Sequence, residues 1–65
     1  SVSVKVYDLQ GRLVNVLAEG ENPAGTFSVH WNGTNLSGQP VESGIYFCVF
    51  QTVDNTISKK LIYLR

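Results

Sequence analysis

Apolar and polar residues alternate along several short stretches of this chain, a pattern that is typical of half-buried β-strands. Over residues 1–7 a valine stands at every second position. Over residues 26–32 the alternation is equally regular, with Val29 and Trp31 on one face and His30 on the other. No stretch repeats its apolar residues at the 3.6-residue period of an amphipathic helix, so we expect little or no helix.

Further strands are predicted at residues 12–18, 44–52 and 57–64. In the first of these, Val14 and Val16 share one face, which we expect to be the inner one, and Leu17 joins them only through a bulge or a bend. The stretch 44–52 is apolar on both faces. Such a pattern indicates a central strand, or one that is covered by a segment outside this sequence.

Turn-forming residues separate these strands. Asp8-Leu9-Gln10-Gly11 fits a type I turn that ends in a left-handed glycine, and Asn32-Gly33 and Ser37-Gly38 each mark a bend. Residues 19–25 and 53–56 are also rich in turn formers. A single five-stranded sheet would leave one apolar face in water, so the pattern predicts an all-β fold class, a small sandwich of two sheets.

The composition of the 65-residue chain argues against several classes of function. Five basic and five acidic residues give a formal net charge of zero, which argues against a nucleic-acid partner. The one cysteine cannot form an intramolecular disulfide. The longest apolar run, residues 45–50, is far shorter than the roughly 20 residues of a membrane-spanning helix. No signal peptide is visible at Ser1, so we expect a mature protein or its last domain, with one module over residues 1–65.

No residues with the spacing of a catalytic or metal site stand out. His30 lies on the outward face without a nucleophile or carboxylate at motif spacing, and Cys48 has no nearby cation that would stabilise a thiolate. Four residues with side-chain oxygens lack the order of a calcium loop, and we interpret them as turn-forming; these are Asn32, Asn35, Ser37 and Asp54. We therefore expect no catalytic residue, no cofactor, no metal and no enzymatic activity.

A set of motifs follows in order along the chain: V-Y-D-L-x-G-R-L-V at residues 6–14, P-A-G-x-x-x-V-x-W-N-G at 23–33, S-G-x-Y at 43–46 and K-K-L-I at 59–62. Together they resemble a bacterial Ig-like module that occurs in flagellar hook-capping proteins and at the C-terminus of proteins exported by the type IX (Por) secretion system. Family members carry a further N-terminal strand. The resemblance therefore implies an Ig-like β-sandwich that is truncated at its N-terminus, with about five of the usual seven strands present.

By the same resemblance, the chain is a non-catalytic C-terminal sorting module that directs type IX secretion and surface attachment of a bacterial extracellular protein. Its partner in that role is the secretion machinery at the outer membrane, reached via the periplasm, and the protein is secreted or held at the cell surface. The alternative is a structural or assembly module, as in the hook-capping relatives, or a spacer of a secreted enzyme. The residues implied in sorting are Gly44, Tyr46, Lys59, Lys60, Leu61 and Ile62, with Tyr46 anchoring its strand and the basic last strand presenting the signal.

Related modules often carry a basic residue at the position of Val49, which implies that this position faces outward. The predicted core accordingly consists of Val4, Val6, Phe27, Val29, Trp31, Tyr46, Cys48, Phe50 and Ile62. The outward side chains of Ile45, Phe47 and Val49 are apolar too. We therefore expect a cover over them, either a preceding segment or domain of the same protein or another copy of the chain.

Overall fold

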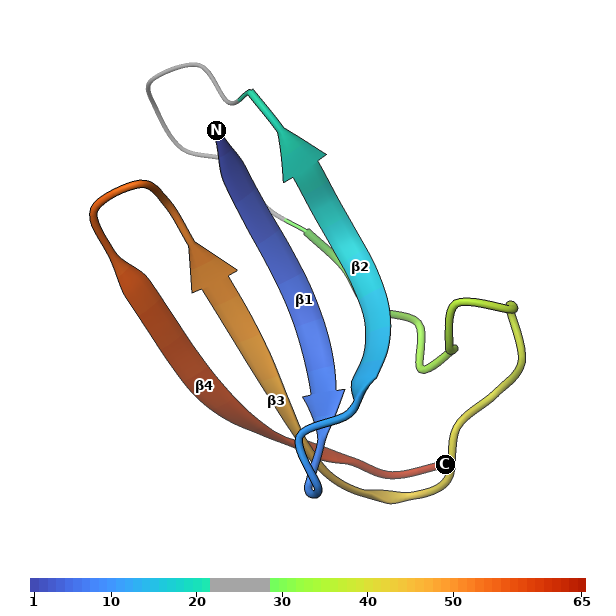
Figure 1. Cartoon of the computed structure of the whole chain (residues 1–65). Coiled ribbons are helices and arrows are strands. Elements are labelled where there is room, and N and C mark those ends of the chain that lie inside the picture. Colours follow the sequence, from blue (N-terminus) through green and yellow to red (C-terminus); the bar gives the residue numbers. More distant parts are fainter. Residues whose placement is uncertain (22–28) are drawn as a thin grey trace.

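The computed structural model describes residues 1–21 and 29–65, whose strands form one antiparallel sheet. These strands are β1 (Val2–Asp8), β2 (Leu13–Gly20), β3 (Gly44–Gln51) and β4 (Thr56–Tyr63). Their order in space is β2-β1-β3-β4, so β2 and β4 are the edge strands (Figure 1). The described residues contain no helix, and hence none long and apolar enough to cross a membrane. The prediction of an all-β fold is confirmed.

The strand predicted at residues 26–32 is the main difference from the expected architecture. Residues 26–28, with the predicted core residue Phe27, lie outside the described residues. Residues 29–32 are not in a strand. They belong to a connection that crosses one face of the sheet, where Trp31 meets side chains of β3 and β4. Among the described residues there is thus one sheet instead of two, which is consistent with part of an Ig-like sandwich.

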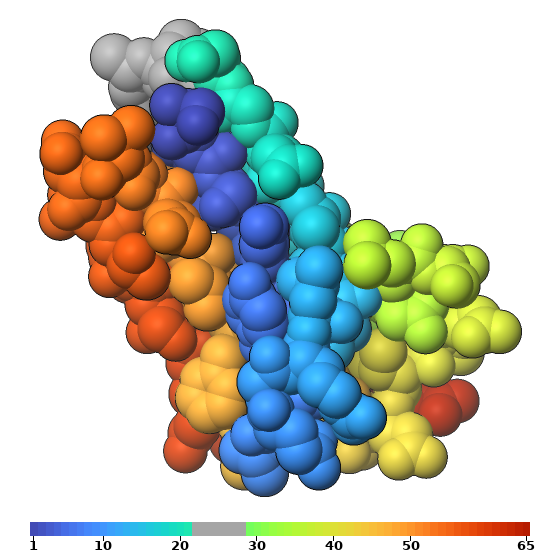
Figure 2. All heavy atoms as spheres, in the orientation of Figure 1, coloured from blue at the N-terminus to red at the C-terminus, as the bar shows by residue number. Residues whose placement is uncertain are grey.

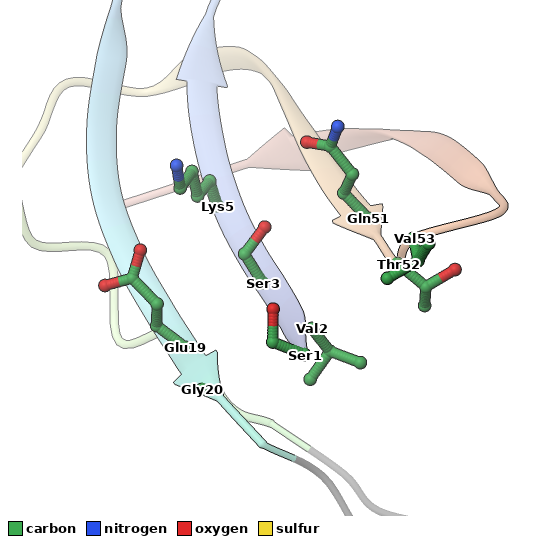
Figure 3. A pocket seen from close by; sticks show the side chains of 9 residues that line it. All are labelled: Ser1, Val2, Ser3, Lys5, Glu19, Gly20, Gln51, Thr52 and Val53. Atoms are coloured by element: carbon green, nitrogen blue, oxygen red, sulfur yellow. The ribbon is translucent and has the colours of Figure 1, made fainter.

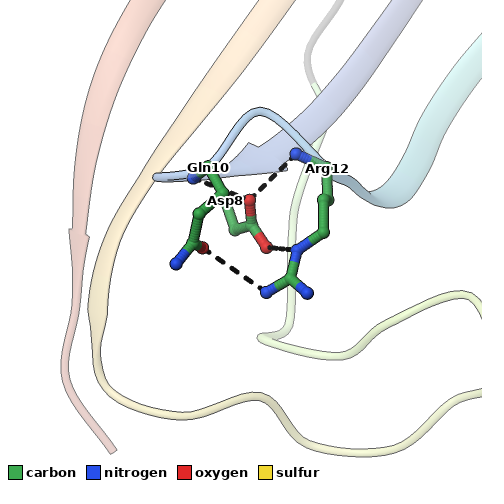
Figure 4. A network of polar contacts seen from close by, with 3 residues as sticks. All are labelled: Asp8, Gln10 and Arg12. Carbon is green, nitrogen blue, oxygen red and sulfur yellow. Dashed lines mark hydrogen bonds and ion pairs between the residues drawn. The ribbon is translucent and has the colours of Figure 1, made fainter.

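The turn between β1 and β2 is closed by the side chain of Asp8. Its Oδ1 accepts hydrogen bonds from the backbone N–H groups of Gln10, at 3.0 Å, and of Arg12, at 2.9 Å (Figure 4). Its Oδ2 accepts one from Arg12 Nε at 2.9 Å. Gly11 donates its N–H to the Asp8 carbonyl at 3.0 Å and has a φ of 84°. The predicted turn with a left-handed glycine is therefore confirmed.

The pairing of β1 with the edge strand β2 shifts register at two places, between Val4 and Lys5 and between Val6 and Tyr7. Val4 and Lys5 are neighbours on β1, but their partners on β2 are Ala18 and Val16, so Leu17 is an extra residue. This confirms that a bulge accommodates Leu17. The prediction that Val16 points inward was wrong, because Val16 lies opposite Lys5, whose side chain is on the outer face of the sheet. The extra residue shifts the inside-outside alternation of β2 by one position.

The core lies on the face of the sheet that the connection crosses. Val6 is fully buried, and Val4 and Tyr46 are buried as well. Cys48 lies opposite Val6, and Phe50 lies opposite Val4, so both share this inner face and are partly buried. The inner residues of the two central strands were thus predicted correctly, by alternation on β1 and, on β3, by the family resemblance that places Val49 outward.

Two predicted core residues are exposed. Val29 is 39% exposed, because it lies in the connection and not in a strand. Ile62 is 69% exposed, because it pairs with Ile45 on the outer face. The inner position on β4 is taken instead by Leu61, which pairs with Tyr46. A difference of one residue in a strand exchanges the two faces, and the prediction for β4 was wrong by that one residue.

Candidate functional site: an aromatic anchor beside an exposed basic strand

Three aromatic rings meet on the inner face of the sheet: Trp31 from the connection, Tyr46 from β3 and Tyr63 from β4. The centroid of the Trp31 ring lies 5.1 Å from that of Tyr46 and 5.2 Å from that of Tyr63. The two tyrosine rings are 6.4 Å apart in an edge-to-face arrangement. These separations are typical of favourable aromatic pairs. We call these three residues the aromatic anchor, because they fasten the connection to the sheet.

The polar atoms of the aromatic anchor are also bonded. Trp31 Nε1 donates a hydrogen bond to the Thr34 carbonyl at 2.8 Å, and the Tyr46 hydroxyl donates one to the Glu42 carbonyl at 2.7 Å. Burial raises the pKa of Tyr46 above its usual value, and the nearby charge of Glu42 raises it further. The phenol therefore stays protonated at neutral pH and acts as a donor. The aromatic anchor thus holds the chain between β2 and β3 at two backbone carbonyls, those of Thr34 and Glu42.

The loop of residues 32–40 projects beyond the β2 edge (Figure 2). Asn35 organises this loop, since its Oδ1 accepts hydrogen bonds from the backbone N–H groups of Ser37, at 2.9 Å, and of Gln39, at 3.0 Å. Gly38 has a φ of 82°, as the predicted bend requires. The turn-forming interpretation of Asn35 is thus confirmed. In the described part of the chain no group of His, Cys, Asp and Glu side chains could hold a metal ion.

Asn15 ties this loop to the sheet. Its Nδ2 donates to the carbonyl oxygens of Thr34, at 2.7 Å, and of Asn35, at 3.3 Å. Its Oδ1 accepts a hydrogen bond from the backbone N–H of Val16 at 2.7 Å. Because Val14 and Val16 were expected to face inward, the alternation implied an outward position for Asn15, and sequence reasoning missed this role. Asn15 lies opposite Val6, so its side chain is on the inner face that the connection crosses, and no local pattern predicted the register shifts that place it there.

The edge strand β4 displays the basic residues that were predicted to matter for sorting. Lys59 and Lys60 are both exposed. Lys59 lies opposite Cys48 and therefore on the inner face, whereas Lys60 lies opposite Phe47 on the outer face. Lysines on an edge strand, and inward-pointing charges above all, oppose edge-to-edge pairing with another sheet. Their exposure suits either that protective role or recognition by a partner.

The six residues predicted for sorting do not form one surface. Tyr46 and Leu61 face each other on the inner side of the β3-β4 pair, and Gly44 lies at the start of β3, opposite Tyr63. The three that are exposed are Lys59, Lys60 and Ile62. Any partner that reads this region from outside therefore meets the two lysines and the isoleucine, while Tyr46 and Leu61 support the strand from within.

A polar hollow lies at the other end of the sheet, between the start of β1 and the ends of β2 and β3 (Figure 3). Ser3, Lys5 and Glu19 are among the residues that line it. Within the described residues the side chain of Lys5 forms no hydrogen bond or ion pair. Among the residues that the structure describes, no hydrogen bond joins the Ser3 hydroxyl to Lys5 or Glu19, the kind of contact that pairs a nucleophile with its activating base.

The two side chains with the most reactive chemistry are set apart from one another. His30 is exposed, and its imidazole has no hydrogen-bond partner in the described part of the chain. Cys48 is partly buried on β3, and burial raises the pKa of its thiol. The thiol thus stays protonated at neutral pH, whereas the thiolate is the nucleophile. A cysteine in this state behaves as a small apolar residue.

A family model described as the FlgD Ig-like domain matches residues 1–55. The chain belongs to this family. The match includes β1, β2, β3 and the connection with Trp31, whereas β4 begins at Thr56, after the matched residues. No curated protein and no solved structure matches the chain. The FlgD Ig-like assignment thus rests on β1, β2, β3 and the connection, which include Trp31 and Tyr46 of the aromatic anchor, and not on β4, which carries Tyr63 and the two lysines.

Proposed function

We propose that this FlgD Ig-like domain is a non-catalytic structural module, which packs against a neighbouring protein body in a larger assembly. The observation that supports the proposal best is the outer face of the sheet. Ile45, Phe47 and Val49 follow one another on this face of β3, and Ile45 is 37% exposed. Antiparallel sheets with one solvated face normally carry polar residues there. An apolar outer face is instead typical of an interaction surface.

The charges around this outer face favour one kind of partner. Lys5 lies opposite Val49, and Lys60 lies opposite Phe47, so amines border the apolar side chains on both sides. Two copies that met face to face would bring lysines of the same sign together, which is unfavourable. The proposed occupant is therefore a preceding segment or domain of the same protein that carries acidic and apolar residues. Another copy of the chain is the competing outcome.

Site-specific photo-crosslinking in the full-length parent protein tests this proposal. A photoreactive phenylalanine in place of Phe47 is expected to crosslink to the preceding part of the same polypeptide. The matched control carries the same group in place of Leu36, which is 62% exposed in the loop, and should give little product. Capture of a second copy through Phe47 would identify a self-associating module. Equal crosslinking from both positions, or none from Phe47, would show that no partner covers the outer face of the sheet.

A second candidate function is the sorting signal of type IX secretion, supported by the exposure of Lys59, Lys60 and Ile62 on an edge strand. In that role the module passes through the periplasm, the secretion machinery at the outer membrane reads the basic strand, and the protein ends at the cell surface or outside the cell. No metal or cofactor takes part in either role.

Export of a reporter fused ahead of this chain, in a host with a type IX system, separates the two functions. The sorting role predicts that removal of residues 59–65 leaves the reporter in the periplasm. Since such a truncation also removes inner residues of β4, the decisive variant is Lys59→Gln with Lys60→Gln, which keeps the strand intact. Lys5→Gln, which removes one amine from β1, serves as a control for the loss of positive charge outside β4. Normal export of the double variant would favour the structural module.

A further inference from the structure

Asn32 and Gly33 form the one Asn-Gly step in this sequence. The step lies between Trp31 and Thr34, which are joined by the hydrogen bond from Trp31 Nε1 to the Thr34 carbonyl. Side-chain amides of asparagine are attacked by the backbone nitrogen of the next residue most readily when that residue is glycine, because no Cβ crowds the approach. Asn32 is exposed, so water reaches its amide. We propose that Asn32 is a site of spontaneous succinimide formation, which converts it to aspartate and isoaspartate.

The local geometry promotes the reaction at this asparagine. The Thr34 hydroxyl donates a hydrogen bond of 2.6 Å to Asn32 Oδ1. When the backbone nitrogen of Gly33 attacks Cγ, negative charge develops on that same oxygen. A donor that is already in place stabilises this charge, in the way that an oxyanion-hole donor does in an enzyme. The same bond restrains rotation of the Asn32 side chain.

The reaction needs no reagent other than water. A bond forms between Gly33 N and Asn32 Cγ, the bond between Cγ and Nδ2 breaks, and the proton of the Gly33 amide leaves with Nδ2 as ammonia. Water then opens the cyclic imide. Cleavage between Cγ and Gly33 N gives aspartate, and cleavage between the backbone carbonyl carbon of Asn32 and Gly33 N gives isoaspartate. Since loss of the amide proton starts the attack, the rate should rise with pH.

The isoaspartate product lengthens the main chain at a position that tolerates little change. Gly33 is buried, and its carbonyl accepts a hydrogen bond of 2.9 Å from the Val41 N–H. The bond from Trp31 Nε1 to the Thr34 carbonyl spans the altered residue. One additional backbone carbon between these two residues moves the loop relative to the aromatic anchor. Formation of isoaspartate therefore weakens the attachment of the loop to the aromatic anchor slowly, as the protein ages. The aspartate product only adds a negative charge.

Peptide mapping by mass spectrometry of the full chain, kept folded in mildly alkaline buffer, tests the proposal. The peptide with Asn32 is expected to show the mass gain that replaces an amide by an acid, together with isoaspartate detected by enzymatic methylation. Asn35 and Asn55 are internal controls, because they precede Leu36 and Thr56 and should remain amides. A folded chain that keeps Asn32 intact, while a short peptide with the same residues is converted, would overturn the proposal.

The Thr34→Val variant isolates the contribution of the hydroxyl, because it keeps the Asn-Gly step and both main-chain acceptor bonds of residue 34. We expect conversion to slow by about tenfold, less than the hundredfold or more that a donor contributes in a dry active site. Circular dichroism would verify that this variant is folded. Should it convert as fast as the parent chain, Thr34 does not promote the reaction. A rate that is flat between neutral and alkaline pH would contradict the attack by the deprotonated backbone nitrogen.

Discussion

Gly33 lies directly against the phenol ring of Tyr63, at a distance that leaves no room for a side chain. A Cβ built on Gly33 would overlap the hydroxyl oxygen and the nearest ring carbons of Tyr63. Gly33 also has a φ of 76°, in the left-handed region that favours glycine. Two independent requirements, one steric and one conformational, thus explain a glycine at the point where the connection meets the aromatic anchor.

The first prediction follows from this contact. Gly33→Ala should lose about 1–2 kcal/mol of stability from the left-handed backbone, and about 1–3 kcal/mol more because the methyl group displaces Tyr63. Gly38→Ala is the matched control, since Gly38 has a φ of 82° but open space around it. Gly38→Ala should lose only the stability that the left-handed backbone costs, about 1–2 kcal/mol. Urea unfolding measures both changes, and equal losses would show that Tyr63 does not restrict residue 33.

A double-mutant cycle makes the same test independent of the backbone. In a Tyr63→Ala background the methyl group of Gly33→Ala meets no ring. The loss of stability caused by Gly33→Ala should then fall to the loss caused by Gly38→Ala. If the cost stays unchanged in that background, the strain at Gly33 lies entirely in its backbone conformation.

Trp31→Ala should destabilise the protein by about 3–5 kcal/mol, as truncation of large aromatic core residues commonly does. The indole contacts both tyrosines of the aromatic anchor, and its loss also leaves the Thr34 carbonyl with one donor fewer. Such a loss is a large part of the roughly 5–15 kcal/mol that stabilises a typical domain. Leu36→Ala, at a residue that is 62% exposed, should change the melting temperature little. An unchanged melt for Trp31→Ala would show that the connection is not anchored through this residue.

Part of the sheet could be predicted because β1 alternates cleanly, and because the family resemblance indicates which face of β3 is the outer one. Val4 and Val6 are buried on β1, as the alternation indicated, and Tyr46 is buried on β3, as the outward position of Val49 implied. The last strand could not be predicted in the same way. Leu61, Ile62, Tyr63 and Leu64 are apolar in both phases, so periodicity did not decide which of them faces inward. The register with β3 decides it, and this register depends on the turn between the two strands.

The candidate site was predictable only in part for a related reason. Tyr46 was identified from the S-G-x-Y motif, but its contacts with Trp31 and Tyr63 join residues far apart in the chain. Residues 29–32 alternate like a strand and yet pair with no described strand, because alternation shows which residues share a face and not whether a neighbouring strand is present. The role of Asn15 depends on the bulged geometry of β2, which is a tertiary feature.

Stability should fall with acid because of Asp8. The backbone N–H of Arg12 lowers the pKa of the Asp8 carboxyl below its ordinary value of 3.8, and the Arg12 guanidinium and the Gln10 N–H lower it further, against partial desolvation. A carboxyl whose pKa is lower in the folded state contributes stability above its unfolded pKa and loses that contribution as the pH falls through the folded value. Thermal melts should therefore show a drop from neutral to strongly acidic pH that is smaller in Asp8→Asn.

The Arg12→Ala variant separates the two contributions of that residue. It keeps the backbone N–H, which is the largest cause of the lowered pKa, and removes only the guanidinium. Most of the acid dependence attributed to Asp8 should persist in this variant. Loss of the whole effect in Arg12→Ala would mean that the exposed ion pair dominates, contrary to the small contribution that surface salt bridges usually make.

Asn15 provides the last prediction, because the identity of its replacement should decide the size of the effect. In Asn15→Ala the two carbonyls that it served keep other donors, Trp31 Nε1 for Thr34 and the Gly38 N–H for Asn35, so the cost should be about 1 kcal/mol. Asn15→Asp should cost more at neutral pH, since a carboxylate would then face two carbonyl oxygens at hydrogen-bond distance. Hydrogen exchange at the Val41 N–H, which closes the loop, should quicken in the same order. An aspartate variant as stable as the parent chain would show that Asn15 does not hold the loop against β2.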